Sequence, residues 1–493
     1  MNPSPHETLD LPAADVRALG DKLLDLAAQW LAGESQAPVL EHLGGDQLEA
    51  LFDEPPPEHG IPDDALLAEL RDKVLRHSRR NGHPRQFAHV CASADPVGAL
   101  ADLLASMINQ NVTAWRSAPS AVTVERLVLR WLDALVGFDG GGHGLLLGGG
   151  SAANLHAVGA AVTQALRQPG ATRGQLVLYT SSETHLSLAK AARFVGVGQV
   201  RVLPVDAERR LPAAVLREAI DGDRAAGLVP MMVVGSAGTA NAGSIDSLVD
   251  LARVCRAADA WFHVDGAYGA PAAMTPGHAF LREGFALADS LSLDPHKWLF
   301  APFDTGALLV RDPQALRDAY TETAEYTAVT ETEPLEAHAF FDHGLELSRR
   351  FRALKLWMMF KLRGVDTYRQ AIAANIALRE YLDQCIDAEP GLERLASGLS
   401  ISCFRYRPDG AGPEAIDRIN ARIQARLVAT GEIALSPTKL DGRYSLRVCI
   451  VNFRTRRADI DWLVERVLAF GREAHVPFDE RGRMDPPRRQ GPA

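Results

Sequence analysis

Apolar residues near the start of the chain recur at helical spacing. Between residues 16 and 31 they fall every three or four positions, which places them on one face of a helix. Three consecutive prolines at 55–57 interrupt the pattern, and a second helical stretch runs from Asp63 to His77. We therefore expect a helical arm over residues 1–85, ahead of the main domain.

From about Phe87 onward, short apolar runs alternate with alanine-rich helical stretches. Four such runs, each expected to be a strand, lie at 144–147, 175–179, 231–234 and 261–264. Strands that alternate with helices favour an α/β core with a mostly parallel sheet. We therefore expect one large α/β domain over residues 86–370.

The pattern changes again after Lys355, where a long helical stretch runs through Tyr381. Shorter elements follow it, namely strand-like runs at 401–406 and 445–451 and a helix at 460–470. This order predicts a smaller α+β domain over residues 371–475. Residues 476–493 carry little apolar content, and we expect them to be disordered.

The composition is that of an ordinary globular protein, with room for more than one domain. Of the 493 residues, 47% are apolar and 23% are charged. The net charge of −10 repels nucleic acid and anionic membranes. No run reaches the roughly 18 apolar residues of a membrane-spanning helix. We therefore expect neither a nucleic acid nor a membrane as a partner.

The N-terminus and the cysteines indicate a cytoplasmic location. The first ten residues lack the basic and apolar regions of a signal peptide. The five cysteines are scattered and contain no CxxC pair, which is typical of reduced thiols and not of disulfides or a zinc site.

Four segments with reactive side chains follow expected strands, at the end where open α/β sheets bind ligands. The first, residues 148–154, is rich in glycine and opens a helix. Its glycines, free N–H groups and Ser151 hydroxyl can hold a phosphate. A tight strand-to-helix turn explains the segment equally well. The GxGxxG and P-loop spacings are absent, so a dinucleotide or P-loop nucleotide site is not indicated.

Asp265 and Lys297 carry the chemistry of the next two segments. Asp265 ends an expected strand, and a carboxylate there suits an ion pair with the protonated ring nitrogen of pyridoxal phosphate (PLP). A helix N-cap is the commoner role of such an aspartate. Lys297 lies between the apolar run at 290–293 and Trp298, so we expect a partly desolvated amine that can act as a nucleophile. Most lysines instead lie free on the surface.

His185 belongs to the fourth segment, residues 179–185, again at the end of an expected strand. A histidine there can lie flat on a cofactor ring and contact a substrate carboxylate. A single histidine is more often an ordinary core or interface residue. Each of the four segments is a weak signal alone, and their order and combination carry the inference.

Taken together, these segments resemble the group II PLP-dependent decarboxylases, the family of aromatic-L-amino-acid, histidine and glutamate decarboxylases. The resemblance spans roughly residues 15 to 470, and the Pro-His-Lys-Trp and His-Val-Asp elements are its most specific parts. The matching stretches are 83–88, 117–119 with Glu125, 150–152, 183–185, 238–239, 263–267, 294–298 and 349–355.

The resemblance implies PLP as the cofactor and a role for each matched residue. Lys297 resembles the Schiff-base lysine, and Asp265 the partner of the ring nitrogen. His185 resembles the imidazole stacked on the ring, and Ala267 a residue packed against the ring. These four residues, with Lys297, Asp265 and His185 as the catalytic set, form the expected centre of the site.

The resemblance also implies the phosphate contacts and the fold. The expected cofactor contacts are His296, Gly150, Ser151, Ala152 and Thr239. The implied fold is α/β of the aspartate-aminotransferase type (fold type I), with a large, mostly parallel seven-stranded sheet and a small α+β C-terminal domain. It further implies a homodimer with shared active sites, whose N-terminal arm wraps the partner subunit.

The implied reaction is decarboxylation of an L-amino acid to its amine, with an aromatic amino acid as the first expectation. Two features qualify the substrate pocket. Trp115 is expected to line it, but the family's aromatic pocket residues are replaced by the stretch that begins at His89.

A loop position leaves the product open. In the aromatic decarboxylases a loop tyrosine before the Arg-Arg-Phe-Arg element helps to return a proton to the substrate. Counted back without gaps from Arg349, that position is Phe340, and members with phenylalanine there release an aldehyde through reaction with oxygen. Tyr326 is the alternative proton donor within the same loop.

Three further functions compete with decarboxylation to an amine. An aminotransferase of the same fold would need Arg447 or Arg454 to hold the substrate carboxylate. A binding protein that has lost its chemistry conflicts with the intact set of matched residues. A metal hydrolase is disfavoured because no HExxH spacing occurs, and we expect no metal ligands.

Overall fold

The larger domain is built on a seven-stranded sheet. The structure, a computed structural model, describes residues 9–322 and 336–475. The strands lie in the order β1-β7-β6-β5-β4-β2-β3. Their bounds are β1 Gly144–Leu147, β2 Leu176–Ser181, β3 Gln199–Leu203, β4 Val229–Ser236, β5 Trp261–Asp265, β6 Ser290–Leu293 and β7 Gly306–Val310.

Strand β7 is antiparallel to both of its neighbours, and the other pairs are parallel. The mostly parallel sheet that the alternating pattern predicts is therefore confirmed. Because β7 runs the other way, its first residue, Gly306, pairs with Leu147 at the carboxyl end of β1. The segment just before β7 thus reaches the edge of the sheet where ligands bind.

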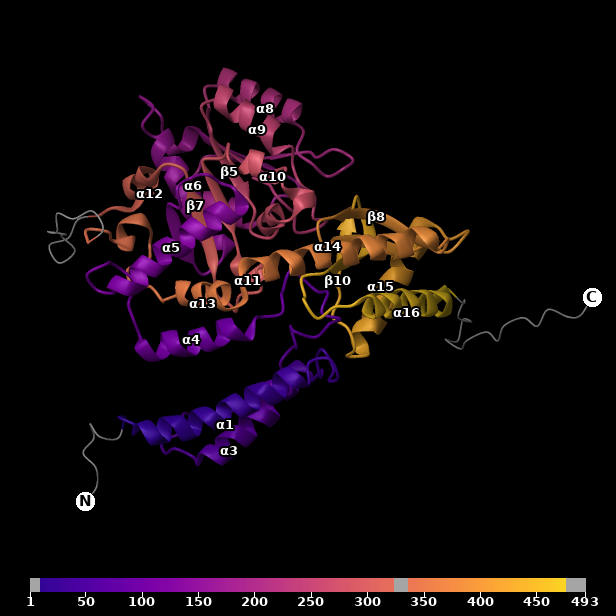
Figure 1. The fold of residues 1–493 in the computed structure, drawn as a ribbon. Helices are drawn as coiled ribbons and strands as arrows, with labels where there is room; N and C mark the ends of the chain where they lie inside the picture. The colour runs from indigo at the N-terminus through magenta and orange to yellow at the C-terminus, as the bar shows by residue number, and fades with distance from the viewer. Residues whose placement is uncertain (1–8, 323–335, 476–493) are drawn as a thin grey trace, which may run out of the picture.

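Two groups of helices pack on the sheet (Figure 1). One is centred on α6, which contacts α7, α12 and strands β1 and β4–β7. The other comprises α9 with α8 and α10, and α13 with α4 and α5. The bounds are α4 Pro96–Ile108, α5 Pro119–Val136, α6 Gly150–Ala165, α7 Ser187–Phe194, α8 Ala213–Ala225, α9 Leu248–Ala257, α10 Leu281–Phe285, α12 Pro313–Tyr320 and α13 Ala353–Arg363.

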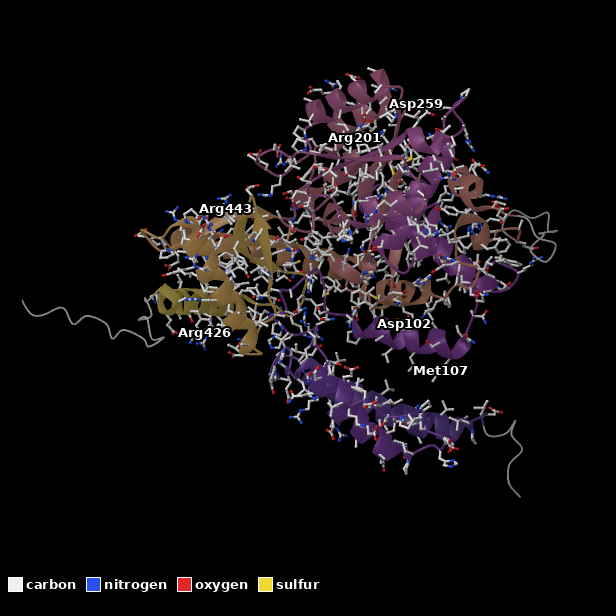
Figure 2. The ribbon with its side chains drawn as sticks, turned by 180° about the vertical axis from the view of Figure 1, so that it is seen from behind. Asp102, Met107, Arg201, Asp259, Arg426 and Arg443 are labelled. Carbon is white, nitrogen blue, oxygen red and sulfur yellow. The ribbon has the colours of Figure 1, made fainter. Side chains whose placement is uncertain are left out.

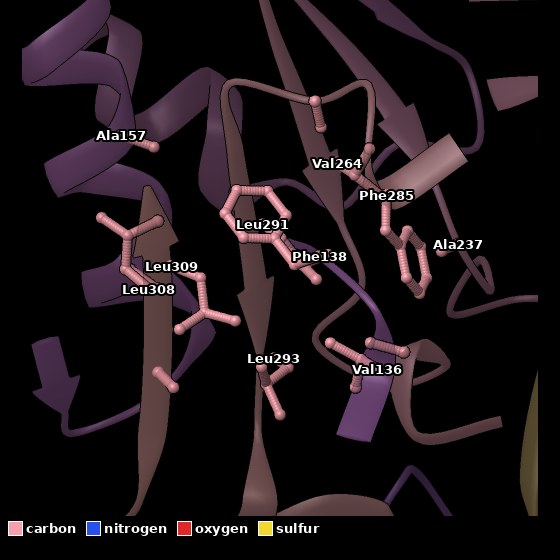
Figure 3. Packing of buried hydrophobic residues seen from close by; sticks show 14 of the residues in the cluster. Val136, Phe138, Ala157, Ala237, Val264, Phe285, Leu291, Leu293, Leu308 and Leu309 are labelled. Carbon is pink, nitrogen blue, oxygen red and sulfur yellow. The ribbon is translucent and has the colours of Figure 1, made fainter. Parts of the chain in front are cut away.

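The central strands are buried on both faces and most of their side chains are apolar, with Ser290, Ser292 and His263 as buried polar exceptions. Leu291 of β6 and Leu308 of β7 are fully buried, as are Phe138 and Phe285 from the surrounding segments. Figure 3 shows these side chains in the apolar core of the larger domain.

Two helices differ from the patterns that predict them. The stretch from Lys355 to Tyr381 forms two helices, α13 and α14 (Val365–Ala388). Gly364 separates them with a φ of 73°, a left-handed conformation that ends a helix and that glycine adopts without strain. The stretch at 63–77 forms α3 (Asp63–Glu69), which continues as a π-helix over Leu70–Leu75.

The smaller domain is a four-stranded antiparallel sheet with its own apolar core. The strand order is β10-β11-β9-β8. Helix α14 contacts both this sheet and the larger domain, so it crosses the boundary expected near residue 370. The bounds are β8 Leu392–Gly398, β9 Ile401–Tyr406, β10 Ser436–Leu440, β11 Arg443–Cys449, α15 Pro413–Ala429 and α16 Arg457–His475. The tail at 476–493 lies outside the described residues.

The N-terminal arm contains α1 (Ala13–Ala32), α2 (Gly45–Ala50) and α3. Helices α1 and α3 lie side by side beyond α4 (Figure 1), and Lys22 bonds to both Asp63 and Asp64 at 2.7 Å. Helix α1 contains no buried residue. Throughout the described ranges, no helix is long and apolar enough to cross a membrane.

Candidate active site

A cavity of about 1030 Å³ lies at the carboxyl edge of the large sheet, beside the small domain. Ser436 and Arg447 of the small domain contribute to its wall. Ten of the residues expected at the site line it: His89, Gly150, Ser151, Ala152, His185, Thr239, Asp265, Ala267, His296 and Lys297. Segments that are far apart in the sequence therefore meet here, as the strand-end argument predicts.

Lys297 lies on α11 (Pro295–Trp298), a short helix directly after β6. Pro295 occupies its first turn, where a missing N–H costs nothing. The Lys297 Nζ is 2.9 Å from Asp294 Oδ2, and a quarter of the lysine side chain is exposed, while Asp294 is buried. The amine is thus held by one carboxylate and remains accessible from the cavity. Sequence reasoning did not assign a role to Asp294.

Asp265 is the last residue of β5, and its carboxylate is fixed on both oxygens. Oδ1 accepts from the Ala267 N–H at 3.1 Å and the Ser292 hydroxyl at 3.3 Å. Oδ2 accepts from Asn154 Nδ2 at 3.2 Å. The bond to the amide two residues on is cap-like, so Asp265 serves the local turn and also presents its carboxylate to the cavity.

His296 has a defined neutral tautomer. Its Nδ1 accepts from the Thr305 N–H at 3.0 Å, so the ring proton is on Nε2, which can donate. Burial lowers the pKa of His296, although the nearby Asp294 carboxylate opposes this shift. The segment before β7 therefore sets the tautomer of the residue beside the lysine.

The glycine-rich turn provides a close approach to His296. Gly149 has a φ of 153°, and a Cβ at this position would lie 3.2 Å from His296 Cε1. A Cβ at Gly150 would lie 3.0 Å from Ala267 Cβ and from Asp294 Oδ2. Without side chains at these positions, the N–H groups that start α6 and the Ser151 hydroxyl are open to an anion.

His185 precedes α7 and lines the cavity. Its Nδ1 is 2.8 Å from Ser187 Oγ, and Ser187 Oγ accepts from Asn154 Nδ2 at 3.0 Å. His263 contacts Asn154 from the other side, with Nε2 3.0 Å from Oδ1. Asn154, Ser187 and His263 thus connect the candidate ring partner to the candidate stacking imidazole.

Sequence reasoning missed these three connecting residues, although weak signals exist. His263 lies two positions before Asp265, so both side chains emerge on one face of β5. Asn154 lies three positions after Ser151 and is the fifth residue of α6, and Ser187 begins α7 two positions after His185. Only the packing of α6 on β5 brings these separate segments into contact.

On the side of the cavity towards the small domain, side chains of that domain bond to backbone groups of the larger domain. His89 has a φ of 58°, and its N–H donates to Ser436 Oγ at 2.9 Å. The Arg447 guanidinium donates to the carbonyls of His89, Ala240 and Asn241. Burial, together with the positive charges of Arg79 and Arg447, lowers the pKa of His89. In the described conformation, Nε and Nη1 of Arg447 therefore donate to backbone carbonyls of the protein.

Trp115 and Phe340 do not line this cavity in their own chain. The backbone N–H of Trp115 donates to the His338 carbonyl. The Phe340 ring is buried, and the Arg349 guanidinium lies 4.3 Å from its centre. Phe340 instead lines a second cavity, of about 400 Å³. Tyr326 lies outside the described residues.

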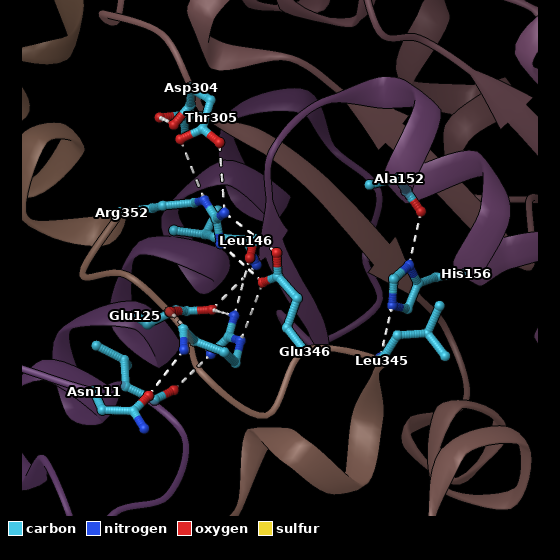
Figure 4. A network of polar contacts seen from close by, with 12 residues as sticks. Asn111, Glu125, Leu146, Ala152, His156, Asp304, Thr305, Leu345, Glu346 and Arg352 are labelled. Carbon is cyan, nitrogen blue, oxygen red and sulfur yellow. Dashed lines mark hydrogen bonds and ion pairs between the residues drawn. The ribbon is translucent and has the colours of Figure 1, made fainter. Parts of the chain in front are cut away.

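The Arg-Arg-Phe-Arg element contacts the segments that carry the site. Arg349 binds the buried Glu125 of α5 with an N–O distance of 2.5 Å, and Arg352 reaches both Glu346 and Asp304. Figure 4 shows these contacts converging beside β1 and the segment before β7. The network fixes the segment that contacts His296.

These groups fit PLP by their chemistry. An accessible amine can condense with its aldehyde, a fixed carboxylate can pair with its ring nitrogen, and the open N–H groups with the His296 donor suit its phosphate. Within the described ranges, no three His, Cys, Asp or Glu side chains are placed to hold a metal ion.

Comparison with known proteins gives matches over most of the chain. The domain described as "Pyridoxal-dependent decarboxylase conserved domain" matches residues 46–407. The chain is 34% identical to the aromatic-L-amino-acid decarboxylase of Bacillus atrophaeus, over 96% of this chain and 98% of the relative.

Solved structures with the same fold include enzymes with two kinds of product. Oryza sativa TDC, solved with PLP and tryptamine, superposes with a TM-score of 0.87 at 29% identity, covering 94% of this chain and 99% of that chain. Rhodiola rosea 4-hydroxyphenylacetaldehyde synthase superposes with a TM-score of 0.87 at 25% identity, over 94% and 99%. The fold expected from the motifs is therefore confirmed.

Proposed function

Because the chain belongs to the family of pyridoxal-dependent decarboxylases, we propose that its substrate is an aromatic L-amino acid and its product the corresponding amine. The chain is a PLP-dependent amino-acid decarboxylase. The aromatic substrate class is supported by the named activities of the relatives, which act on aromatic amino acids. The observation that carries the site assignment is the meeting of Lys297, Asp265 and His185 in one cavity.

The proposed mechanism assigns one task to each group. When bound, PLP supplies the electron sink for the bond between Cα and the carboxylate. Lys297, whose amine is accessible from the cavity, would hold the cofactor through its aldehyde. Asp265 keeps the ring nitrogen protonated. His185, which lines the same cavity, would hold the substrate carboxylate.

The phosphate is assigned to the turn that starts α6. Gly150 and Ser151 offer N–H groups and a hydroxyl there, His296 offers its Nε2 proton, and Ala152 lines the same turn. Thr239 and Ala267 line the same cavity beside the ring partner. We propose these residues as the remaining cofactor contacts.

Release of an aldehyde is the second candidate. It is favoured by Phe340, which falls at the loop tyrosine's position when counted back without gaps from Arg349, and by two relatives that are aldehyde synthases. Transamination has less support. Arg447 donates to three carbonyls, and Arg454 pairs with Glu34 at 2.9 Å and does not line the cavity.

A product assay tests the proposal. Purified protein with PLP is given each of the twenty amino acids, and carbon dioxide, amine, aldehyde, keto acid and peroxide are measured. We expect carbon dioxide and amine in equal amounts, with an aromatic amino acid as the best substrate. Keto acid without carbon dioxide would contradict decarboxylation, and a preference for acidic amino acids would contradict the substrate class.

We also propose that the active unit is a homodimer and that the protein is cytoplasmic. The dimer is supported by apolar side chains on α4 that no part of the described chain covers: Leu100, Leu103, Leu104, Met107 and Ile108, each 44–59% exposed. Figure 2 shows Met107 at the rim of α4, facing the arm. Apolar patches of this kind mark interfaces.

The five free cysteines support the proposed cytoplasmic location, because thiols stay reduced in that compartment.

A further inference from the structure

A line of buried hydrogen bonds begins at Trp261, far from the cavity. The indole Nε1 of Trp261 is 2.8 Å from Ser290 Oγ, which is 2.8 Å from His263 Nδ1. His263 Nε2 is 3.0 Å from Asn154 Oδ1. All four of these side chains are at most 4% exposed, so their polar atoms depend on one another and not on water.

The line divides at Asn154 and ends at the cavity. Asn154 Nδ2 is 3.2 Å from Asp265 Oδ2 and 3.0 Å from Ser187 Oγ. Ser187 Oγ is 2.8 Å from His185 Nδ1. One branch therefore reaches the carboxylate assigned to the ring nitrogen, and the other reaches the imidazole assigned to the substrate carboxylate.

The chemistry of Asp265 and His263 fixes which atom donates in each hydrogen bond between Trp261 and Asp265. The Asp265 carboxylate only accepts, so Asn154 must turn its NH₂ group towards it and its carbonyl towards His263. His263 must then donate from Nε2. Burial lowers the pKa of His263 to about 4, so the ring is neutral and its Nδ1 accepts the Ser290 proton. Trp261 can only donate, which agrees with this direction.

The same reasoning fixes the second branch. The remaining NH₂ proton of Asn154 goes to Ser187 Oγ, so the Ser187 hydroxyl proton is free to go to His185 Nδ1. The Ser187 backbone N–H also points to this nitrogen, at 3.4 Å. Two donors thus meet Nδ1, which must carry a lone pair.

We propose that this line of hydrogen bonds holds His185 as the neutral tautomer with its proton on Nε2, and that Asn154 and Ser187 are positioning residues for it. Nδ1 is used by Ser187, and no described residue bonds to Nε2, which is left to the cavity. The proton is therefore presented where a ligand oxygen can accept it.

The tautomer matters for the substrate, a step that rests on the proposed function. A proton on Nε2 donates to an α-carboxylate, whereas a lone pair there would repel it. Because Asn154 binds both Asp265 and Ser187, the partner of the ring nitrogen and the holder of the carboxylate are oriented by one amide. The Asn154 amide would therefore set the position of the group that binds the cofactor ring relative to the group that binds the substrate carboxylate.

The first test reads the tautomer directly. The ¹⁵N spectrum of histidine-labelled holoenzyme reports which ring nitrogen carries the proton, with His185 signals assigned by their loss in His185→Gln. We expect Nε2–H in the wild type, a mixture of tautomers in Ser187→Ala, and recovery of Nε2–H in Ser187→Thr. Nδ1–H or an equal mixture in the wild type overturns the proposal, as does a spectrum that Ser187→Ala leaves unchanged.

The second test uses kinetics to separate the inference from the proposed function. One net hydrogen bond corresponds to a factor of up to about ten, so the KM for the amino acid should rise by about that factor in Ser187→Ala and recover in Ser187→Thr. The PLP dissociation constant should stay within about twofold, because the first branch is intact. An unchanged KM with the expected tautomer change would overturn the role of His185 in binding the carboxylate and support the hydrogen-bond line.

Asn420→Ala is the matched control. Asn420 is a fully buried asparagine on α15 that bonds to the backbone of Tyr406 and Ile416, away from the cavity. Its loss should reduce stability without moving the His185 tautomer or the KM. If Asn420→Ala changes the tautomer as Ser187→Ala does, the effect is general loosening and the proposal is wrong.

Discussion

At the scale of single residues, the site combines an accessible amine with carboxylates whose positions are fixed. Asp294 holds Lys297, and three donors hold Asp265. Such fixed groups need no reorganisation when a charged ring is bound between them, which is the usual source of electrostatic catalysis. Two residue-scale predictions follow from this arrangement.

Lys297 is expected to carry the cofactor. The purified protein should be yellow, because the Nζ faces the cavity on the segment that links β6 and β7. Borohydride reduction followed by peptide mapping should place the pyridoxyl group on Lys297 alone. Lys190, which is exposed on α7, is the internal control, and label on any other lysine contradicts the assignment.

Asp265→Asn should lower turnover by orders of magnitude, because a neutral amide no longer keeps the ring nitrogen protonated. Removal of one partner from an ion pair in a dry site costs about 3–5 kcal/mol. The measurement is kcat at saturating PLP, with Asp250→Asn, an exposed carboxylate on α9, as the control. Turnover within a few-fold of the wild type would mean that Asp265 is only a structural cap.

At the scale of elements, the segment between α12 and α13 contains both the arginines that support the site and the loop residues proposed to act on the product. Its C-terminal part is anchored by Arg349 and Arg352, which also support the segment beside His296. Its N-terminal part includes Tyr326 and lies outside the described residues. The anchored part sets stability, and the loop residues bear on the product.

The anchor can be tested through stability. Arg349→Leu leaves the Glu125 charge buried without its partner, so the free energy of unfolding should fall by about 3–5 kcal/mol. Arg253→Leu removes an exposed pair with Asp250 on α9 and should change it by less than about 1 kcal/mol. Urea unfolding of both variants compares the two; equal, small effects would show that the buried pair contributes little.

We predict that the loop residues determine whether the product is amine or aldehyde. If Phe340 occupies the tyrosine's place in catalysis, part of the product should be aldehyde with peroxide, and Phe340→Tyr should shift it towards amine by supplying a proton donor. If Tyr326 donates instead, the wild type should give clean amine and Tyr326→Phe should produce aldehyde. We expect clean amine, since the Phe340 ring is buried against Arg349 in its own chain. Peroxide in step with carbon dioxide from the wild type would contradict this expectation.

At the scale of the whole molecule, helix α4 and the arm both carry exposed apolar side chains. Helix α1 buries no residue, although Leu23 and Leu24 are apolar, and α4 exposes Leu103 and Met107. An amphipathic helix with an uncovered apolar face is stable only when another surface covers it. A second copy of this chain is the proposed partner.

The proposed dimer predicts a change of mass in solution. Wild-type protein should sediment as a dimer, and the double change Leu103→Lys with Met107→Lys should shift it towards monomer, because buried charges oppose association. Phe280→Lys, at another exposed apolar position, is the control and should leave the mass unchanged. A wild-type monomer with full activity would refute the proposal.

The sequence by itself determined the class of fold and the ten predicted residues that line the cavity. Short apolar runs that alternate with helical stretches favour buried strands, and polar side chains that end such strands meet at one edge of a parallel sheet. Lys297, Asp265 and His185 are predictable for this reason, since each position is fixed by its place at a strand end.

Only the tertiary structure decided how distant segments meet. The reversed direction of β7 brings Thr305 to His296, and the small domain brings Ser436 and Arg447 to the cavity wall. Asn154 joins two branches of hydrogen bonds because α6 packs on β5. Local patterns encode which face of an element is buried, whereas contacts between segments far apart in the chain depend on how those faces pack together.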